Sequence, residues 1–137
     1  MDAASIYEQI RACEMRIEEH EEEIAHLQGK IARLAEAKDH YQKKQAGFDD
    51  YMWRERTKIK QVQDSSRIRL ADSFAEAMHS LCNGSSHTRA ENAFTGIGKK
   101  LDAGKQRFED EIHDHRRAIE DLRDEIAYLR SRLLSLA

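Results

Sequence analysis

The chain has 137 residues, of which 36% are charged, and it contains no proline. Its formal net charge of −3 argues against a dedicated nucleic-acid-binding protein, because such proteins usually carry a basic excess. Charge-rich sequence with few aromatic residues and helical periodicity is typical of long helices and coiled coils. We therefore expect a single all-α domain, either an elongated antiparallel helical hairpin or a coiled-coil bundle.

The first predicted helix covers about residues 5–46. Ser5 and Glu8 have the spacing of a capping box, which satisfies free backbone N–H groups at a helix N-terminus. Apolar residues then recur every four and three positions, which predicts a coiled-coil face. The members of this face include Ile6, Ile10, Cys13, Ile17, Ile24, Leu27, Ile31 and Leu34.

A second helix is predicted over about residues 49–82, because Gly47 can break or bend the first one. The apolar spacing is looser here, but helix-forming residues dominate. Asn83 and Gly84 both tolerate the left-handed conformation found at helix C-termini. We therefore expect a turn over residues 83–88.

The third predicted helix covers about residues 89–136. Thr88 and Glu91 repeat the capping-box spacing, and Ile and Leu again recur at heptad positions. The segment Phe94-Thr95-Gly96-Ile97-Gly98 should interrupt this helix, since two glycines together cost about 2 kcal/mol of helix propensity.

Two arrangements of these helices fit the pattern. In the favoured one, the two heptad helices pair antiparallel and the middle helix flanks or caps them. Pairing Ile10 with Leu129 and Ile17 with Leu122 puts a positions opposite d positions, although a shift by one heptad would do so equally. In the other arrangement, residues 5–82 form one helix whose heptads need a second chain, which predicts a homodimer.

His20 and His115 occupy d positions within the two heptad faces. In the favoured register they lie in adjacent layers, so we expect the two imidazoles to be neighbours in the interior. Buried polar residues of this kind fix the register of coiled coils. A sharper hypothesis is a pH-sensitive layer, because a protonated imidazole is unfavourable in an apolar interior.

No pattern in the sequence predicts catalysis or a cofactor. Glu23 and His26 have the Glu-x-x-His spacing of metal-binding bundles, and Asp110 and His113 repeat it. The heptad phase directs these four side chains away from the core, so we expect no metal site and no enzyme.

The sequence also limits where the protein can reside. Cys13 and Cys82 have neither the number nor the spacing of a disulfide framework or zinc site. The chain shows no signal peptide and no apolar stretch long enough to span a membrane. We expect a cytoplasmic protein that could still leave the cell without a cleaved signal.

A local basic stretch is interpreted as a solvated helix face and not as a nucleic-acid site; it comprises Arg54, Arg56, Lys58, Lys60, Arg67 and Arg69.

Tyr51 and Trp53 form an aromatic cluster in the middle helix. Packing in the core is the simpler interpretation of these two residues. A partner-binding anchor is the alternative, because Trp and Tyr dominate the binding energy of many interfaces.

The Phe94-Thr95-Gly96 segment, followed by a heptad helix, resembles the Trp/Phe-x-Gly element of the small helical hairpin proteins of type VII secretion. The whole layout resembles the helical accessory proteins encoded beside LXG toxins in Gram-positive bacteria. Phe94 stands where that family usually has tryptophan. The family's C-terminal Tyr-x-x-x-Asp/Glu export signal is not found here, since Tyr51 and Glu55 have the letters in the wrong place.

The resemblance implies a non-enzymatic, chaperone-like adaptor. Its partner would be the helical domain of a secreted LXG toxin, a second small helical protein, or both, and it would help to target the toxin for export. Phe94 and Gly96 are the residues that the resemblance assigns to the partner. The alternative function is a self-associating coiled-coil scaffold that has no link to secretion.

Overall fold

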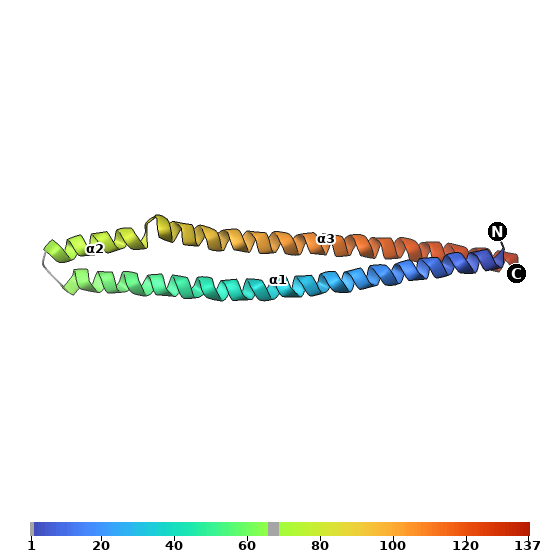
Figure 1. The fold of residues 1–137 in the computed structure, drawn as a ribbon, viewed down its shortest axis with the longest axis horizontal. Helices are drawn as coiled ribbons and strands as arrows, with labels where there is room; N and C mark the ends of the chain where they lie inside the picture. Colours follow the sequence, from blue (N-terminus) through green and yellow to red (C-terminus); the bar gives the residue numbers. More distant parts are fainter. Residues whose placement is uncertain (1, 66–68) are drawn as a thin grey trace. The chain divides into compact units, whose positions relative to one another are not determined.

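The computed structural model describes residues 2–65 and 69–137, and 97% of it is helical. Helix α1 spans Ala3–Ser65, α2 spans Arg69–Cys82 and α3 spans Ser85–Leu136 (Figure 1). The described residues contain no strand, so the all-α helical hairpin predicted from the sequence is confirmed. The chain divides into two compact units. Unit 1 is Met1–Leu34 with Ala103–Ala137, and unit 2 is Ala35–Asp102.

Unit 1 pairs the start of α1 with the end of α3, and the two chain termini lie side by side (Figure 1). Its core contains heptad residues from both helices: Ile6, Ile10, Cys13, Leu122, Ile126 and Leu129. Burying one Ile or Leu side chain contributes about 1.5–3 kcal/mol, so this face holds the two helices together.

The antiparallel direction of unit 1 is visible in its cross-helix ion pairs. Glu14 lies 3.8 Å from Arg130, and Glu21 lies 3.9 Å from Arg123. A step of seven residues toward the C-terminus of α1 is therefore matched by a step of seven residues toward the N-terminus of α3. This is the antiparallel heptad pairing expected from the sequence.

Unit 2 contains the end of α1, all of α2 and the start of α3. Helix α2 runs back along α1 (Figure 1), and their shared core is formed by Met52, Ile59, Ala75 and Cys82. Phe48 and Met78 are partly buried against this core. Within unit 2, α2 therefore lies antiparallel to the end of α1.

Three predicted boundaries are wrong. Helix α1 continues through Gly47, where a Cβ atom would meet nothing within 4 Å. A helix over 49–82 does not exist, because α1 ends at Ser65 and α2 begins at Arg69. The turn over 83–88 is reduced to a short break, since α3 already begins at Ser85. The alternative of one helix over residues 5–82 fails for the same reason.

The predicted helix starts also differ from the observed ones. Asp2 caps α1, because its Oδ1 accepts a hydrogen bond of 2.8 Å from the backbone N–H of Ser5. Thr88 lies inside α3, where its hydroxyl donates to the carbonyl oxygen of Gly84 at 3.3 Å. The expected interruption over residues 94–98 is absent, because α3 is continuous there.

Candidate functional site

Tyr51 and Trp53 are both exposed, and they lie on opposite sides of α1. The exposed fractions are 59% for Tyr51 and 66% for Trp53. Each is one residue from the buried Met52, and one residue turns a helix by about 100°, so the two rings flank the core on different sides. The interpretation that they pack in the core is therefore wrong, and they do not form one cluster.

Trp53 lines a surface hollow of about 330 Å³ in unit 2. The hollow lies between α1 and α2, and its other lining residues are Arg56, Thr57, Lys60, Asp64 and His79. We call this the Trp53 hollow. It offers a partner an indole face beside two cations and one carboxylate, which is the composition of a protein-binding anchor.

The basic residues predicted to form a solvated face divide into two groups. Arg54 pairs with Asp50 at 2.9 Å and Lys58 pairs with Glu55 at 3.3 Å, each within one turn of α1. Such exposed pairs contribute little to stability. Arg56 and Lys60 instead face the Trp53 hollow. Arg67 lies outside the described residues, as does the side chain of Arg69.

The opposite side of unit 2 carries exposed apolar residues, of which only Tyr51 was predicted from the sequence as a site residue. We call them the apolar flank: Tyr51, Val62, Phe74 and Leu81. Phe74 and Leu81 each come one position before a buried residue of α2, Ala75 and Cys82. Tyr51 likewise comes one position before the buried Met52 of α1. In an antiparallel helix pair, residues that precede core positions lie on the same side, so these side chains share one surface. The seven-residue spacing of Phe74 and Leu81 was the signal that could have revealed it.

Phe94 packs inside unit 2. Its side chain is half-buried, and its ring centroid lies 6.4 Å from that of Tyr41 and 5.7 Å from that of Phe48. Gly96, two residues on, has open space where a Cβ would stand. Gly98 is the buried glycine, with the Tyr41 hydroxyl against it.

Arg56 connects α1 to the break between α2 and α3. Its Nη2 donates to the Asn83 side-chain oxygen at 2.7 Å and to the Cys82 carbonyl at 3.5 Å. His87 lies beside it, stacked on Phe48 with ring centroids 5.4 Å apart, and contacts Glu91 at 2.8 Å. Arg56 Nε and His87 Nδ1 are buried, and neither has a hydrogen-bond partner within the described part of the chain. This contact holds the end of α2 against α1.

His20 and His115 are in contact, as the antiparallel register predicts. Their Nδ1 atoms lie 2.8 Å apart and their ring centroids 5.0 Å apart. Both side chains are half-buried, not fully enclosed as expected. Their role as a pH-sensitive layer stays a prediction.

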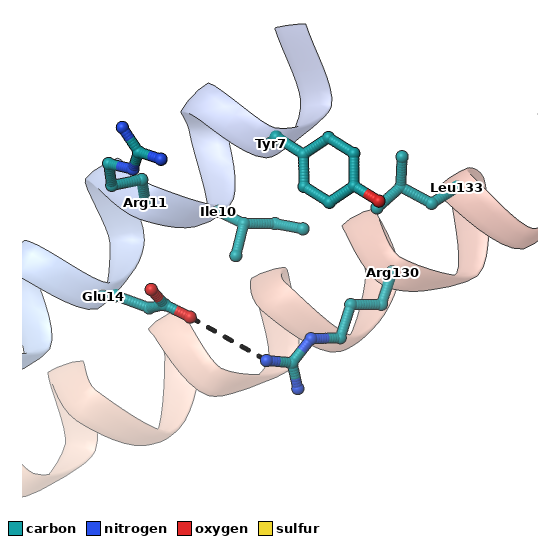
Figure 2. Close-up of a pocket in the computed structure, with 6 residues that line it drawn as sticks. All are labelled: Tyr7, Ile10, Arg11, Glu14, Arg130 and Leu133. Carbon is teal, nitrogen blue, oxygen red and sulfur yellow. Dashed lines mark ion pairs between the residues drawn. The ribbon is translucent and has the colours of Figure 1, made fainter. Parts of the chain in front are cut away.

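A second hollow, in unit 1, is lined by Tyr7, Ile10, Arg11, Glu14, Arg130 and Leu133. In Figure 2, Glu14 of α1 and Arg130 of α3 reach toward each other across it. Their exposed ion pair at 3.8 Å contributes at most about 1 kcal/mol. Its exposed aromatic residue is Tyr7, whose ring is smaller than the indole of Trp53, so the Trp53 hollow is the stronger candidate for binding.

No protein-family model, curated protein or solved structure matches this chain.

Among residues 2–65 and 69–137, no three His, Cys, Asp or Glu side chains converge so that they could hold a metal ion. Within the same residues, none of the helices combines the length and apolar character needed to cross a bilayer.

Among the side chains that the structure describes, Cys13 and Lys38 have a shifted pKa. Burial raises the pKa of the Cys13 thiol, and the nearby negative charge of Glu125 raises it further. The hydrogen bond with Asp102, at 2.9 Å, and its negative charge raise the pKa of Lys38. Neither group lies in the Trp53 hollow, so neither shift points to chemistry there.

Proposed function

We propose that this protein is a non-enzymatic helical adaptor that binds a partner helix through the Trp53 hollow. The observation that carries the proposal is the exposure of Trp53, two thirds of which faces solvent beside Arg56 and Lys60. Leaving a large indole in water is unfavourable, and a partner that covers it gains that burial energy. Trp and Arg are also the residues most enriched at binding hot spots.

The partner that we propose is the helical domain of an LXG-type toxin, which the adaptor would help to target for export. This part of the proposal rests on the resemblance of the layout to the accessory proteins of type VII secretion. It does not rest on Phe94, because the ring of Phe94 packs against Tyr41 and Phe48. Trp53 is therefore the residue expected to make the partner contact.

The single tryptophan of the chain makes the test direct, because intrinsic fluorescence reports on Trp53 alone. We expect the emission of the free protein to be that of an indole in water. Adding the purified helical domain of an LXG toxin, with its own tryptophans replaced by phenylalanine, should shift the emission to shorter wavelength, because the partner excludes water from the ring.

Substitution provides the quantitative test. Trp53→Ala should weaken binding by about 2 kcal/mol or more, which is roughly thirtyfold in Kd, as measured by isothermal titration calorimetry. Tyr128→Ala is the matched control, since Tyr128 is exposed to a similar extent, 60%, but lies in unit 1. Equal affinity for wild type and Trp53→Ala would contradict the proposed docking site. Absence of binding to any LXG domain would contradict the proposed partner.

The second candidate is a self-associating scaffold, and the apolar flank favours it. Leu81 is 69% exposed and Phe74 is 48% exposed on the outer side of α2. The core heptad residues of unit 1 are already buried within one chain, so we expect self-association to use this flank. The oligomeric state of the purified protein separates the two candidates.

A further inference from the structure

The contact between His20 and His115 brings two ligand-type nitrogens together across unit 1. The residues come from α1 and α3, and their Nδ1 atoms are 2.8 Å apart with the ring planes tilted by 53°. Each side chain is only half-buried, so part of each ring remains open to solvent. The pair is independent of the Trp53 hollow, which lies in unit 2.

Two neutral imidazoles at this distance share one proton, because one Nδ1 must donate while the other accepts. If the donor ring carries its proton on Nε2 instead, both Nδ1 lone pairs become available to a third atom. Tautomerisation of this kind moves a proton within one ring and changes no charge. The pair can therefore exchange its hydrogen bond for a bound cation.

The spacing of the two nitrogens suits a metal ion. With metal–nitrogen bonds of about 2.0–2.1 Å, two nitrogens lie about 2.9 Å apart when they are cis at a right angle, and about 3.3 Å apart in a tetrahedron. The observed 2.8 Å is close to the cis spacing, so the helices already stand at a suitable distance. The rings now point toward each other, and each must turn about its Cβ–Cγ bond to let the lone pairs converge.

Two carboxylates stand near the pair. Glu23 follows His20 by three residues and Glu111 precedes His115 by four, so each lies one helical turn from an imidazole. Glu23 directly precedes Ile24, and Glu111 directly precedes Ile112, and both isoleucines belong to the heptad faces. In an antiparallel helix pair, this places the two carboxylates on the same side. The ion pairs Glu14–Arg130 and Glu21–Arg123 occupy the other side. Glu23 and Glu111 thus give the site negative charge.

We propose that His20 and His115 bind one divalent transition-metal ion between α1 and α3. Water, or Glu23 and Glu111 after a change of rotamer, completes its coordination, because no third ligand converges on the pair among the described side chains. Cu²⁺ is the preferred ion, since it binds nitrogen ligands most tightly in the divalent series and favours tetragonal geometry with cis ligands. Binding joins two helices, so it stabilises the folded hairpin.

Titration of Cu²⁺ into the full chain at pH 7.5, followed by calorimetry and electron paramagnetic resonance, tests the proposal. We expect one tight site per chain, a spectrum with coupling to imidazole nitrogens, and a melting temperature that rises with the Cu²⁺ concentration. The His20→Leu, His115→Leu variant should bind at least about tenfold more weakly, because both ligands are lost. Leucine suits d positions, so this variant should fold, which circular dichroism checks.

The matched control is the His26→Leu, His113→Leu variant. It also removes one histidine from α1 and one from α3, but both of these side chains are exposed and outside the pair. It should bind Cu²⁺ as wild type does, and Glu23→Gln, Glu111→Gln should bind more weakly. Equal binding by wild type and the His20→Leu, His115→Leu variant would overturn the proposal, as would tighter binding of Zn²⁺ than of Cu²⁺.

Discussion

At the scale of single residues, Cys13 shows how the core of unit 1 controls a reactive group. The thiol is buried among Ile6, Ile10 and the facing leucines of α3, next to the carboxylate of Glu125. Desolvation and the adjacent negative charge both disfavour the thiolate, which is the nucleophilic form. Cys13 should therefore react slowly with alkylating reagents in the folded protein.

The same shift predicts how stability depends on pH. The raised pKa means that the folded state holds the Cys13 proton more tightly than the unfolded chain does. The unfolded chain begins to lose this proton above about pH 8.5, so this contribution to stability is full below that pH and declines as the pH rises through the folded-state pKa. Urea unfolding at pH 7.5 and 9.5 should show a smaller loss in Cys13→Val than in wild type. Equal losses would mean that Cys13 is not responsible.

At the scale of helices, the glycines of α3 carry a matched prediction. A Cβ at Gly96 would meet nothing within 4 Å, whereas a Cβ at Gly98 would lie 2.6 Å from the Tyr41 hydroxyl oxygen. Alanine favours a helix over glycine by about 1 kcal/mol, so Gly96→Ala should stabilise the protein by about that amount. Gly98→Ala should be destabilising relative to Gly96→Ala by at least about 1 kcal/mol, because Tyr41 must move.

Chemical denaturation of the two single variants measures this difference. Adding Tyr41→Phe to Gly98→Ala removes the hydroxyl and should restore part of the lost stability, as a double-mutant cycle would reveal. Identical effects of alanine at positions 96 and 98 would contradict the close packing of Tyr41 on α3.

The heptad pattern predicted the two faces that pair α1 with α3, because Ile and Leu recur at a and d positions. It fixed neither the register nor the choice between this pairing and one helix over residues 5–82, and the structure has the antiparallel pair within one chain. Predictions of helix breaks from local sequence were wrong where contacts between helices stabilise a continuous helix. Gly96 and Gly98 do not break α3, since packing of Tyr41 and Phe48 against it offsets their poor propensity. Asn83 and Gly84 end α2 without reversing the chain, because Arg56 holds that end against α1.

The candidate binding site was predicted only in part. Trp53 was recognised by residue type, but its hollow needs Lys60 from the same helix and His79 from α2, and no local pattern joins them. Phe94 was chosen by resemblance to a known family. Its packing against Phe48 depends on which residues of α1 and α3 lie opposite each other, and no local pattern shows this. The sequence identifies residue types that commonly bind partners. Whether a given side chain is exposed depends on which residues of the paired helices lie opposite it.

At the scale of the whole molecule, we expect a monomer of 15.9 kDa at micromolar concentration. The heptad faces of α1 and α3 are already covered by each other, so they leave no core for a second chain. Native mass spectrometry over a dilution series checks this mass. A stable dimer that dissociates on Leu81→Glu would instead favour the scaffold, because Leu81 belongs to the apolar flank.

The position of the termini has a mechanical consequence. Both ends lie side by side in unit 1 (Figure 1), so a force that pulls them apart acts across the helix pair and not along it. The core residues nearest the two ends, Ile6 and Leu133, would carry the whole load first, and each later layer would be loaded only after the previous one had opened. Unit 1 should therefore unzip at low force, in steps that follow its heptads, whatever its equilibrium stability.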